Sequence, residues 1–267
     1  MLTEPTLTDA QGRSFRNLRV SLTAACNYAC NYCVPKGKQL HRARHELDTG
    51  QFLRALDYLV EVAGIEKLRI TGGEPLLSPQ FDDFLYGAMQ RPLKDVSITT
   101  NGQFLLQKMP VLKAAGIRRI NVSLDTLHPV MFQKICRSGD LPTVLAGIDA
   151  LLDAGIKVKI NMVPMRTQNE DQIVPLLDYC LARGIELRFI ELMRMGHWQH
   201  NADYSRELVP MGRILSLIAQ CYTYLRTAAE FDATAARFEI PGKGFFGIIA
   251  NESLPFCSTC SRLRLSS

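Results

Sequence analysis

Three cysteines lie close together near the start of the chain, with the spacing Cys26-x3-Cys30-x2-Cys33. This spacing allows three thiolates from one loop to bind a single inorganic centre. Three thiolates leave one iron of a four-iron, four-sulfur cluster without a protein ligand, and an open metal position is what a catalytic site requires. We therefore predict that Cys26, Cys30 and Cys33 hold a catalytic cluster whose open iron a cofactor can chelate.

Two other interpretations of these thiols stay open. A structural zinc ion would need a fourth ligand, and His41 and His45 are the nearest candidates in the sequence. Both histidines lie in a charged segment, residues 36–46, that is more simply a solvated loop. The three thiols could also be incidental.

The other five of the eight cysteines fall into two groups. Cys257 and Cys260 form a second pair with metal-ligand spacing. The remaining three stand alone in or beside helical patterns, where a cysteine most often packs as a small apolar residue. We expect such packing roles for Cys136, Cys180 and Cys221.

The composition is that of a globular protein and excludes a disordered or collagen-like chain, since 47% of the 267 residues are hydrophobic and 21% are charged. The net charge of +5 is too weak a bias for a nucleic-acid binder, but it suits an anionic small-molecule substrate. Residues 1–12 are polar, and no stretch approaches the roughly 18 apolar residues of a membrane span. We therefore expect a cytoplasmic protein, in which clustered cysteines are metal ligands or redox groups.

The elements that must position these residues alternate between apolar strands and amphipathic helices. The expected strands are 18–23, 68–71, 96–100, 120–124, 158–163 and 186–190, and the expected helices are 49–63, 79–89, 107–115, 141–154 and 171–183. Several helices end at a glycine suited to a helix C-terminus, as at Gly64, Gly116, Gly155 and Gly184.

This alternation predicts an α/β fold with a parallel sheet covered on its outer face. Six units are too few for a closed eight-stranded barrel, so we predict an open, partial (β/α)6 barrel. Active sites of such sheets lie at the carboxyl ends of the strands. Chemically capable residues do follow the strands here: Cys26 follows the first, Gly72-Gly73-Glu74-Pro75 the second and Asp125 the fourth.

The cysteine stretch, with an aromatic residue just before its last cysteine, resembles the signature of radical S-adenosylmethionine (SAM) enzymes. In that superfamily the methionyl group of SAM chelates the open iron, and an electron from the cluster cleaves SAM to a 5′-deoxyadenosyl radical. Gly72-Gly73-Glu74-Pro75 resembles the second motif of the superfamily, which implies that Glu74 holds the methionyl amino group. A carboxylate pairs well with an ammonium group.

The resemblance extends over nearly the whole chain to the molybdenum cofactor biosynthesis protein A family of GTP 3′,8-cyclases. The matching stretches are residues 18–23, 67–75, 99–102, 118–125, 188–191 and 256–265. In this family Cys-x2-Cys and a later cysteine hold a second four-iron cluster, whose open iron contacts the guanine of GTP. The resemblance thus implies that Cys257 and Cys260 are ligands of a second cluster, if the missing ligand is supplied.

Site residues follow from the same resemblance, position by position. Besides Glu74, the residues that match SAM contacts are Tyr32, Gly73, Ser123 and Met193. The residues that match GTP contacts are Arg19, Arg69, Thr99, Lys159, Arg188, Arg262 and Arg264, with Lys67 as a weaker match. Arg and Lys in a shielded cavity suit a triphosphate, because they form charge-assisted hydrogen bonds to its oxygens.

The sequence departs from the family pattern in a few places. Where the family has Asp-Arg before the first cysteine and a basic residue after the second motif, this chain has Ala24-Ala25 and Leu77-Ser78. The chain also stops at Ser267, before the third auxiliary cysteine and the Gly-Gly tail of the family. It could be truncated, could recruit another ligand, or could have abandoned the second cluster. We favour truncation, because Arg262 and Arg264 have little reason to remain without a nucleotide site, and we expect SAM cleavage with poor GTP cyclisation.

The resemblance implies a radical SAM lyase that converts GTP to 3′,8-cyclo-7,8-dihydroguanosine 5′-triphosphate. We expect a radical SAM partial barrel in residues 1–195 and an auxiliary-cluster segment in residues 196–267. The expected partners are GTP, a reductant such as flavodoxin or ferredoxin, and a second copy in a homodimer, but no nucleic acid and no membrane. The alternatives are a related radical SAM enzyme acting on another nucleotide or a peptide, and a non-catalytic Fe–S or zinc protein.

Overall fold

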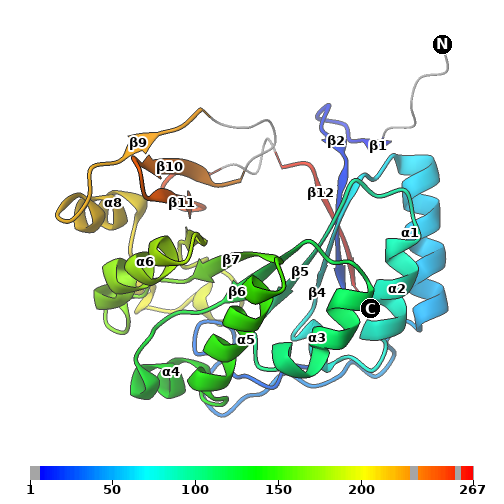
Figure 1. The fold of residues 1–267 in the computed structure, drawn as a ribbon, viewed down its shortest axis with the longest axis horizontal. Coiled ribbons are helices and arrows are strands. Elements are labelled where there is room, and N and C mark those ends of the chain that lie inside the picture. The colour runs from blue at the N-terminus through cyan, green and yellow to red at the C-terminus, as the bar shows by residue number, and fades with distance from the viewer. Residues whose placement is uncertain (1–6, 229–233, 256–259, 267) are drawn as a thin grey trace.

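The fold is built on one strongly curved sheet, seen in a computed structural model that describes residues 7–228, 234–255 and 260–266 (Figure 1). Its ten strands follow the order β12-β3-β4-β5-β6-β7-β8-β11-β10-β9. Their bounds are β3 Asn17–Ser21, β4 Lys67–Thr71, β5 Asp95–Thr100, β6 Arg119–Ser123, β7 Lys157–Met162, β8 Glu186–Ile190, β9 Leu225–Arg226, β10 Ala236–Ile240, β11 Gly244–Ile249 and β12 Arg262–Ser266. A separate pair, β1 Leu7–Thr8 and β2 Ser14–Phe15, precedes the sheet.

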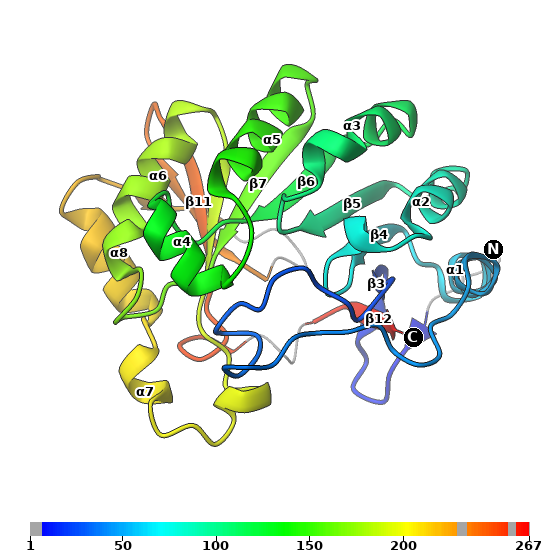
Figure 2. The same cartoon turned by 90° about the horizontal axis from the view of Figure 1, so that it is seen from below.

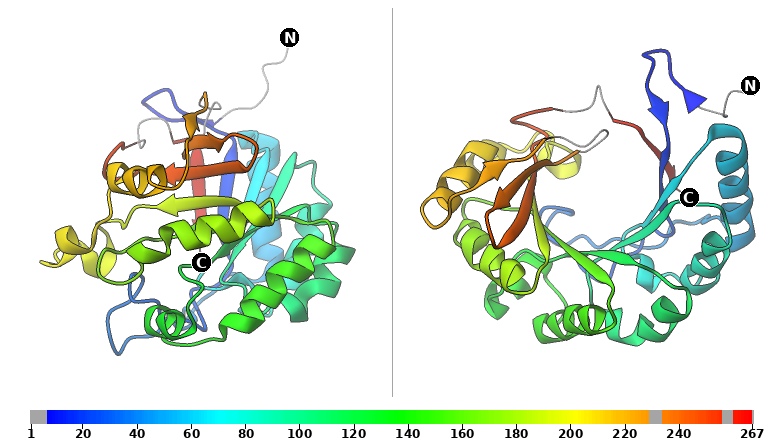
Figure 3. Two further views of the ribbon diagram at one scale, coloured as in Figure 1. Left: turned by 60° about the vertical axis from the view of Figure 1, so that its left-hand side comes forward. Right: turned by 45° about the horizontal axis from the view of Figure 1, so that its top comes forward.

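Helices cover the outer, convex face of the sheet, and the inner face is left open on one side (Figure 3). Those that connect the parallel strands are α1 Thr49–Ala63, α2 Phe81–Met89, α3 Leu105–Ala114, α4 Pro129–Cys136, α5 Leu141–Asp153 and α6 Ile173–Ala182. The later helices are α7 Tyr204–Glu207 and α8 Met211–Ala219, and the short 3-10 turns are Pro75–Leu77, Glu170–Gln172 and Gly196–Trp198. None of the helices in the described residues is long and apolar enough to cross a membrane.

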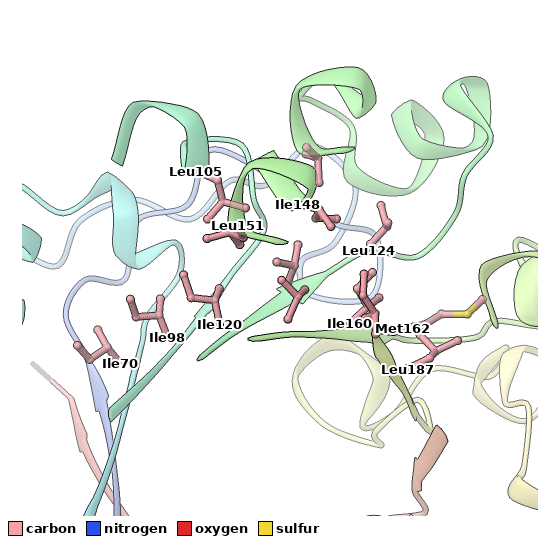
Figure 4. Close-up of a cluster of buried hydrophobic side chains, with 14 of the residues drawn as sticks. Ile70, Ile98, Leu105, Ile120, Leu124, Ile148, Leu151, Ile160, Met162 and Leu187 are labelled. Carbon is pink, nitrogen blue, oxygen red and sulfur yellow. The ribbon is translucent and has the colours of Figure 1, made fainter. Parts of the chain in front are cut away.

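The two faces of the sheet carry different side chains. In β3, β4 and β7 every second residue is buried, and in β5 and β6 the burial is more continuous. The outward-facing residues form the core with the helices, as Figure 4 shows for Ile70, Ile98, Ile120, Ile160 and Leu187 of five neighbouring strands. Because strand side chains alternate between faces, the remaining positions point into the concave side of the sheet, where polar and basic residues gather.

The six predicted strands and the predicted partial α/β barrel are confirmed, and the strand bounds differ by only one or two residues. Gly64, Gly116, Gly155 and Gly184 follow helices with φ between 65° and 71°, as expected for helix C-termini. The helix α4 was not predicted. Its eight residues begin with a proline and are too few for the periodicity to stand out.

The C-terminal part of the chain extends this sheet at both ends. Strand β11 pairs with β8 in parallel, and β12 pairs with β3 in parallel. The barrel strands therefore lie between two elements from the end of the sequence. Glu191, directly after β8, fastens one of them: its carboxylate accepts hydrogen bonds from the amides of Glu252 and Ser253 at 2.8 and 2.9 Å, and from the amide of Met211 at 2.7 Å.

Candidate active site

The cysteine-bearing loop begins where β3 ends and is fastened there by the turn after β4. The amide of Gly73 donates to the carbonyl of Thr23 at 2.7 Å, and the amide of Glu74 donates to that of Ala25 at 2.8 Å. A Cβ atom on Gly73 would lie 2.2 Å from the Ala25 oxygen. Position 73 therefore requires glycine, because its backbone lies so close to that of Ala25. Through this contact the turn after β4 fixes where the cysteine loop begins.

The loop then crosses one end of the sheet toward α4 (Figure 2). Cys26 accepts weak hydrogen bonds at its Sγ from the amide of Tyr28 at 3.4 Å and from Asn101 Nδ2 at 4.0 Å. Cys33 is exposed, and its amide donates to the Cys30 carbonyl at 2.8 Å in a tight turn. The three thiols of the loop therefore lie at the carboxyl end of the sheet, as the sequence predicted.

The thiol pKa values in this loop are high. Burial raises the pKa of Cys26 to about 11. Although Cys33 is exposed as a residue, loss of solvation at its thiol raises its pKa to about 12, and the neighbouring thiols of the loop add to both shifts. The pKa of Cys30 is also raised, first by a hydrogen bond with Cys136 and then by burial. A positively charged iron centre favours the thiolate form and reverses this preference, so the donor set suits an iron–sulfur cluster.

The structural zinc alternative depends on a histidine as the fourth ligand. His41 and His45 are both exposed. Across the described residues, no three His, Cys, Asp or Glu side chains are placed to hold one metal ion. A four-iron cluster is wider than a single ion, so its ligands need not converge on one point.

Glu74 is buried and already accepts several protein hydrogen bonds. Its Oε1 accepts from Thr100 Oγ1 at 2.7 Å and from the Leu76 amide at 3.0 Å, and its Oε2 accepts from the Asn101 amide at 2.7 Å. Burial raises the pKa of Glu74 to about 7 despite these bonds. Each carboxylate oxygen can accept two hydrogen bonds, so Oε2 can take one more donor, such as an ammonium group.

Tyr32 connects the cysteine loop to the segment that follows β6. Its hydroxyl donates to Asp125 Oδ2 at 2.8 Å, and Asp125 Oδ1 accepts from the Val163 amide at 2.8 Å. Burial raises the pKa of Asp125 to about 6. Ser123 ends β6 on the inner face two residues earlier, whereas Met193 is 38% exposed in the loop after β8.

All eight residues matched to GTP contacts lie at inward-facing positions of the sheet. Register brings those of adjacent strands into rows: Arg264 pairs with Arg19 and Arg19 with Arg69, while Lys159 pairs with Asn121 and Asn121 with Thr99. The others of the set are Lys67 on β4, Arg188 on β8 and Arg262 on β12. The structure therefore brings together on one concave surface residues that are up to 245 positions apart, from Arg19 to Arg264.

The arginines in these rows repel one another. Burial lowers the pKa of Arg69 to about 9, and the charges of Arg188 and Arg19 lower it further. Burial and the neighbouring Arg264 and Arg262 lower the pKa of Arg19 to about 10. The Nε atoms of Arg69 and Arg188 are buried without a hydrogen-bond partner among the described residues. Buried like charges with unmet donors suit a multivalent anion, which would satisfy both.

Not every member of the set is free to bind. Lys159 Nζ forms an ion pair with Glu186 at 2.8 Å, and Arg188 donates to Asn121 Oδ1 at 2.5 Å. Lys67 and Arg264 are exposed.

A cavity of about 550 Å³ opens beside Lys159 at the amino ends of β7 and β8, a volume typical of small-molecule sites.

Sequence reasoning missed two further cations of this surface. Arg119 on β6 lines the same cavity and forms a bidentate ion pair with Asp95, and Arg237 on β10 lines it as well and lies 3.4 Å from Glu186. Strand alternation places Arg119 on the inner face and could have found it. Arg237 depends on the pairing of β10 with β11, for which the sequence has no local signal.

The remaining cysteines confirm some predictions and correct one. Cys136 and Cys180 are buried, as expected for packing residues. Cys221 is exposed just after α8, so its predicted packing role is wrong. Cys260 is half-buried beside β12, and the second ligand of the auxiliary pair, Cys257, lies outside the described residues.

Comparisons with known proteins agree along nearly the whole chain. Residues 20–180 match the Radical SAM superfamily, and residues 185–267 match Molybdenum Cofactor Synthesis C. A GTP 3′,8-cyclase of Synechocystis sp. is 36% identical over 98% of this chain and 79% of the relative, and one of Aquifex aeolicus is 36% identical over 97% and 82%.

Solved structures show the same fold at low sequence identity. The SuiB protein of Streptococcus suis, solved with its precursor peptide, superposes with a TM-score of 0.65 at 18% identity, over 77% of this chain and 46% of that one. Coproporphyrinogen III oxidase from Escherichia coli, described as a radical SAM enzyme, superposes with a TM-score of 0.53 at 14% identity, over 88% and 63%.

Proposed function

Since the chain belongs to the GTP 3′,8-cyclase family of radical SAM enzymes, we propose that it converts GTP to 3′,8-cyclo-7,8-dihydroguanosine 5′-triphosphate in molybdenum cofactor biosynthesis. One structural observation carries the choice of a nucleoside triphosphate. The inner face of the sheet holds half-buried arginines on β3, β4 and β8 whose charges repel one another. A polyphosphate offsets this repulsion and accepts their unmet hydrogen bonds.

At the carboxyl end of the sheet, we assign Cys26, Cys30 and Cys33 as the three ligands of a [4Fe-4S] cluster. When bound, the cluster supplies the electron that cleaves SAM. Glu74 offers the free acceptor site of its Oε2 to the methionyl ammonium group, and Asn101 and Thr100 hold that carboxylate in place. The assignment is supported by the fixed start of the loop and by the donor set.

Tyr32, Gly73, Ser123 and Met193 complete the proposed SAM site. Tyr32 is held by Asp125, and this hydrogen bond fixes the loop residue next to the last cysteine. Gly73 acts through the backbone, because its contact with the segment before Cys26 sets where the loop begins. These residues therefore position the cofactor relative to the inner face, where the substrate lies.

On the inner face, the proposed GTP contacts are Arg19, Lys67, Arg69, Thr99, Lys159, Arg188, Arg262 and Arg264. Arg69 and Arg188 each bring a buried Nε donor that has no partner among the described residues. Lys159 and Arg188 exchange protein partners for phosphate oxygens when the nucleotide binds. The protein would thus neutralise the triphosphate on the inner face of the sheet.

Further parts of the proposal concern the rest of the system. We assign the radical SAM barrel to residues 1–195 and the auxiliary segment to residues 196–267. Cys257 and Cys260 serve a second [4Fe-4S] cluster if a third ligand is supplied. A flavodoxin or ferredoxin supplies the electron, two copies form a homodimer, and the enzyme works in the cytoplasm.

An anaerobic reconstitution tests the proposal. The chain is loaded with iron and sulfide, its iron content is measured, and SAM, reductant and GTP are added. We expect 5′-deoxyadenosine together with a cyclised nucleotide. If SAM is cleaved at the same rate with and without GTP and no nucleotide product forms, GTP is not the substrate. The assignment to the radical SAM superfamily would still stand. Zinc in place of iron and no cleavage of SAM would overturn both.

A further inference from the structure

Cys136 lies against the loop that carries the three clustered cysteines. The amide of Ala29 donates to the Cys136 carbonyl at 3.0 Å, and the amide of Asn31 donates to the Ile135 carbonyl at 3.0 Å. The residues on both sides of Cys30 are therefore hydrogen-bonded to the end of α4. The two segments lie side by side at this point.

A second contact strengthens this attachment. Arg137, in the left-handed conformation that ends α4 (φ 58°), donates from its Nη1 to the carbonyls of Val34 and Pro35 at 3.2 and 3.0 Å. The end of α4 thus holds the loop both before and after Cys33. These hydrogen bonds before and after Cys30 fix the position of its backbone relative to α4.

The two cysteines lie together inside this junction. Cys136 is 4% exposed and buried at the point where the backbone on both sides of Cys30 is hydrogen-bonded to the end of α4, and it raises the pKa of Cys30. Cys136 is therefore a fourth thiol at the proposed cluster site, one that the cysteine spacing does not reveal.

We propose that Cys30 and Cys136 form a reversible disulfide when the cluster is absent. The proposal goes beyond the proposed function and rests on it only in treating Cys30 as a cluster ligand. An iron-bound Cys30 thiolate is unavailable for the bond, so the disulfide belongs to the cluster-free protein. It protects Cys30 from irreversible oxidation, and it must be reduced before a cluster can assemble.

The oxidant is a low-molecular-weight disulfide such as oxidised glutathione. Cys33, the most exposed thiol of the loop, gives up its proton to water as it attacks the small disulfide and releases one small thiol, and Cys30 then displaces the second small thiol to form a Cys30–Cys33 bond. Cys136 next attacks the Cys30 sulfur, and Cys33 leaves as a thiol. In total two protein thiols are oxidised to one disulfide, and one small disulfide is reduced to two thiols.

Two physical reasons place the bond finally at Cys136. The backbone on both sides of Cys30 is already hydrogen-bonded to Cys136 and Ile135, so little backbone movement is needed to join Cys30 to Cys136. A disulfide between segments distant in sequence also restricts the unfolded chain more than one across the short loop from Cys30 to Cys33. The bond to Cys136 is therefore the more stable of the two.

Peptide mapping tests the proposal without SAM or GTP, so that its failure is distinct from failure of the proposed function. The reconstituted full chain is treated with an iron chelator and oxidised glutathione, and free thiols are blocked by alkylation. Trypsin places Cys30 in the peptide 20–36 and Cys136 in the peptide 135–137. We expect these peptides to be linked in most molecules, with fragmentation assigning the link to Cys30.

Variants provide the controls. Cys136→Ser should abolish the link, and Cys136→Ala should do the same if the serine variant folds poorly. Cys180→Ser removes another buried cysteine, on α6, and should leave the link unchanged. A wild-type chain in which Cys30 is joined to Cys33 or Cys26, while Cys136 is alkylated only after denaturation, would overturn the proposal.

Discussion

The amide of Gly73 donates a hydrogen bond to the carbonyl of Thr23 at 2.7 Å, and this contact joins the turn after β4 to the segment that leads into the cysteine loop. A side chain at position 73 would collide with the backbone oxygens of Ala25 and Ala24, at 2.2 and 2.6 Å. Neither oxygen belongs to a flexible side chain. The position of the loop therefore depends on a missing Cβ atom.

Gly73→Ala should destabilise the protein by about 3 kcal/mol, because overpacking against backbone cannot relax by side-chain rotation. It should also lower the iron content after reconstitution, since the loop start shifts. Denaturant unfolding and iron analysis measure the two effects. Gly212→Ala is the control, because a Cβ atom there meets nothing within 4 Å, and stability should rise slightly. Unchanged stability of Gly73→Ala would contradict the tight contact.

Glu74→Gln should change how stability depends on pH. Burial raises the folded-state pKa of Glu74 to about 7 from 4.5, so the folded protein binds the proton more tightly than the unfolded chain. The corresponding stability is present at low pH and is lost as pH rises through 7. Relative to the variant, the wild type should lose about 3 kcal/mol between pH 5 and pH 8.

Denaturant unfolding of the apo-protein at both pH values measures this difference for Glu74→Gln. Asp95→Asn is a control with the opposite shift, because the ion pair with Arg119 lowers the pKa of Asp95. Its stabilising effect is lost only at a pH below 3.8, so its difference from wild type should be flat between pH 5 and pH 8. A flat difference for Glu74→Gln as well would refute the prediction.

Arg69→Met should separate stability from nucleotide binding. The buried guanidinium is repelled by Arg188 and Arg19, so its removal should stabilise the nucleotide-free protein by about 1 kcal/mol or more. The affinity for GTP should fall about 10- to 100-fold, because a charge-assisted hydrogen bond is lost. Thermal unfolding and calorimetric titration of GTP measure the two quantities. Lys113→Met, at an exposed position of α3, should change neither.

Glu191→Gln should loosen the attachment of the C-terminal strands. The carboxylate accepts from the amides of Met211, Glu252 and Ser253, and an amide side chain would place a donor against donors. We expect a loss of about 2–4 kcal/mol, together with faster amide exchange at Glu252 and Ser253. Glu61→Gln, an exposed position on α1, is the matched control and should show neither effect. Normal exchange protection in Glu191→Gln would show that other contacts hold the segment.

The sequence alone determined the local features of this protein. Alternating apolar residues marked the strands, and glycines such as Gly64 and Gly155 marked the helix ends, because both signals arise from backbone geometry within a few residues. The spacing of Cys26, Cys30 and Cys33 likewise predicted the loop proposed to hold the cluster. The short helix α4 was missed, since its eight residues are too few to display a period.

Only the tertiary structure decided which distant residues meet. It placed Arg264 beside Arg19, Arg237 beside Glu186, and Cys136 against Cys30. It also showed the close backbone contact that Gly73 makes with Thr23 and Ala25. Strand register and helix packing depend on the burial of the whole core at once, and no local period encodes that. The sequence thus predicted which residues are chemically capable, and the fold decided which of them lie next to one another.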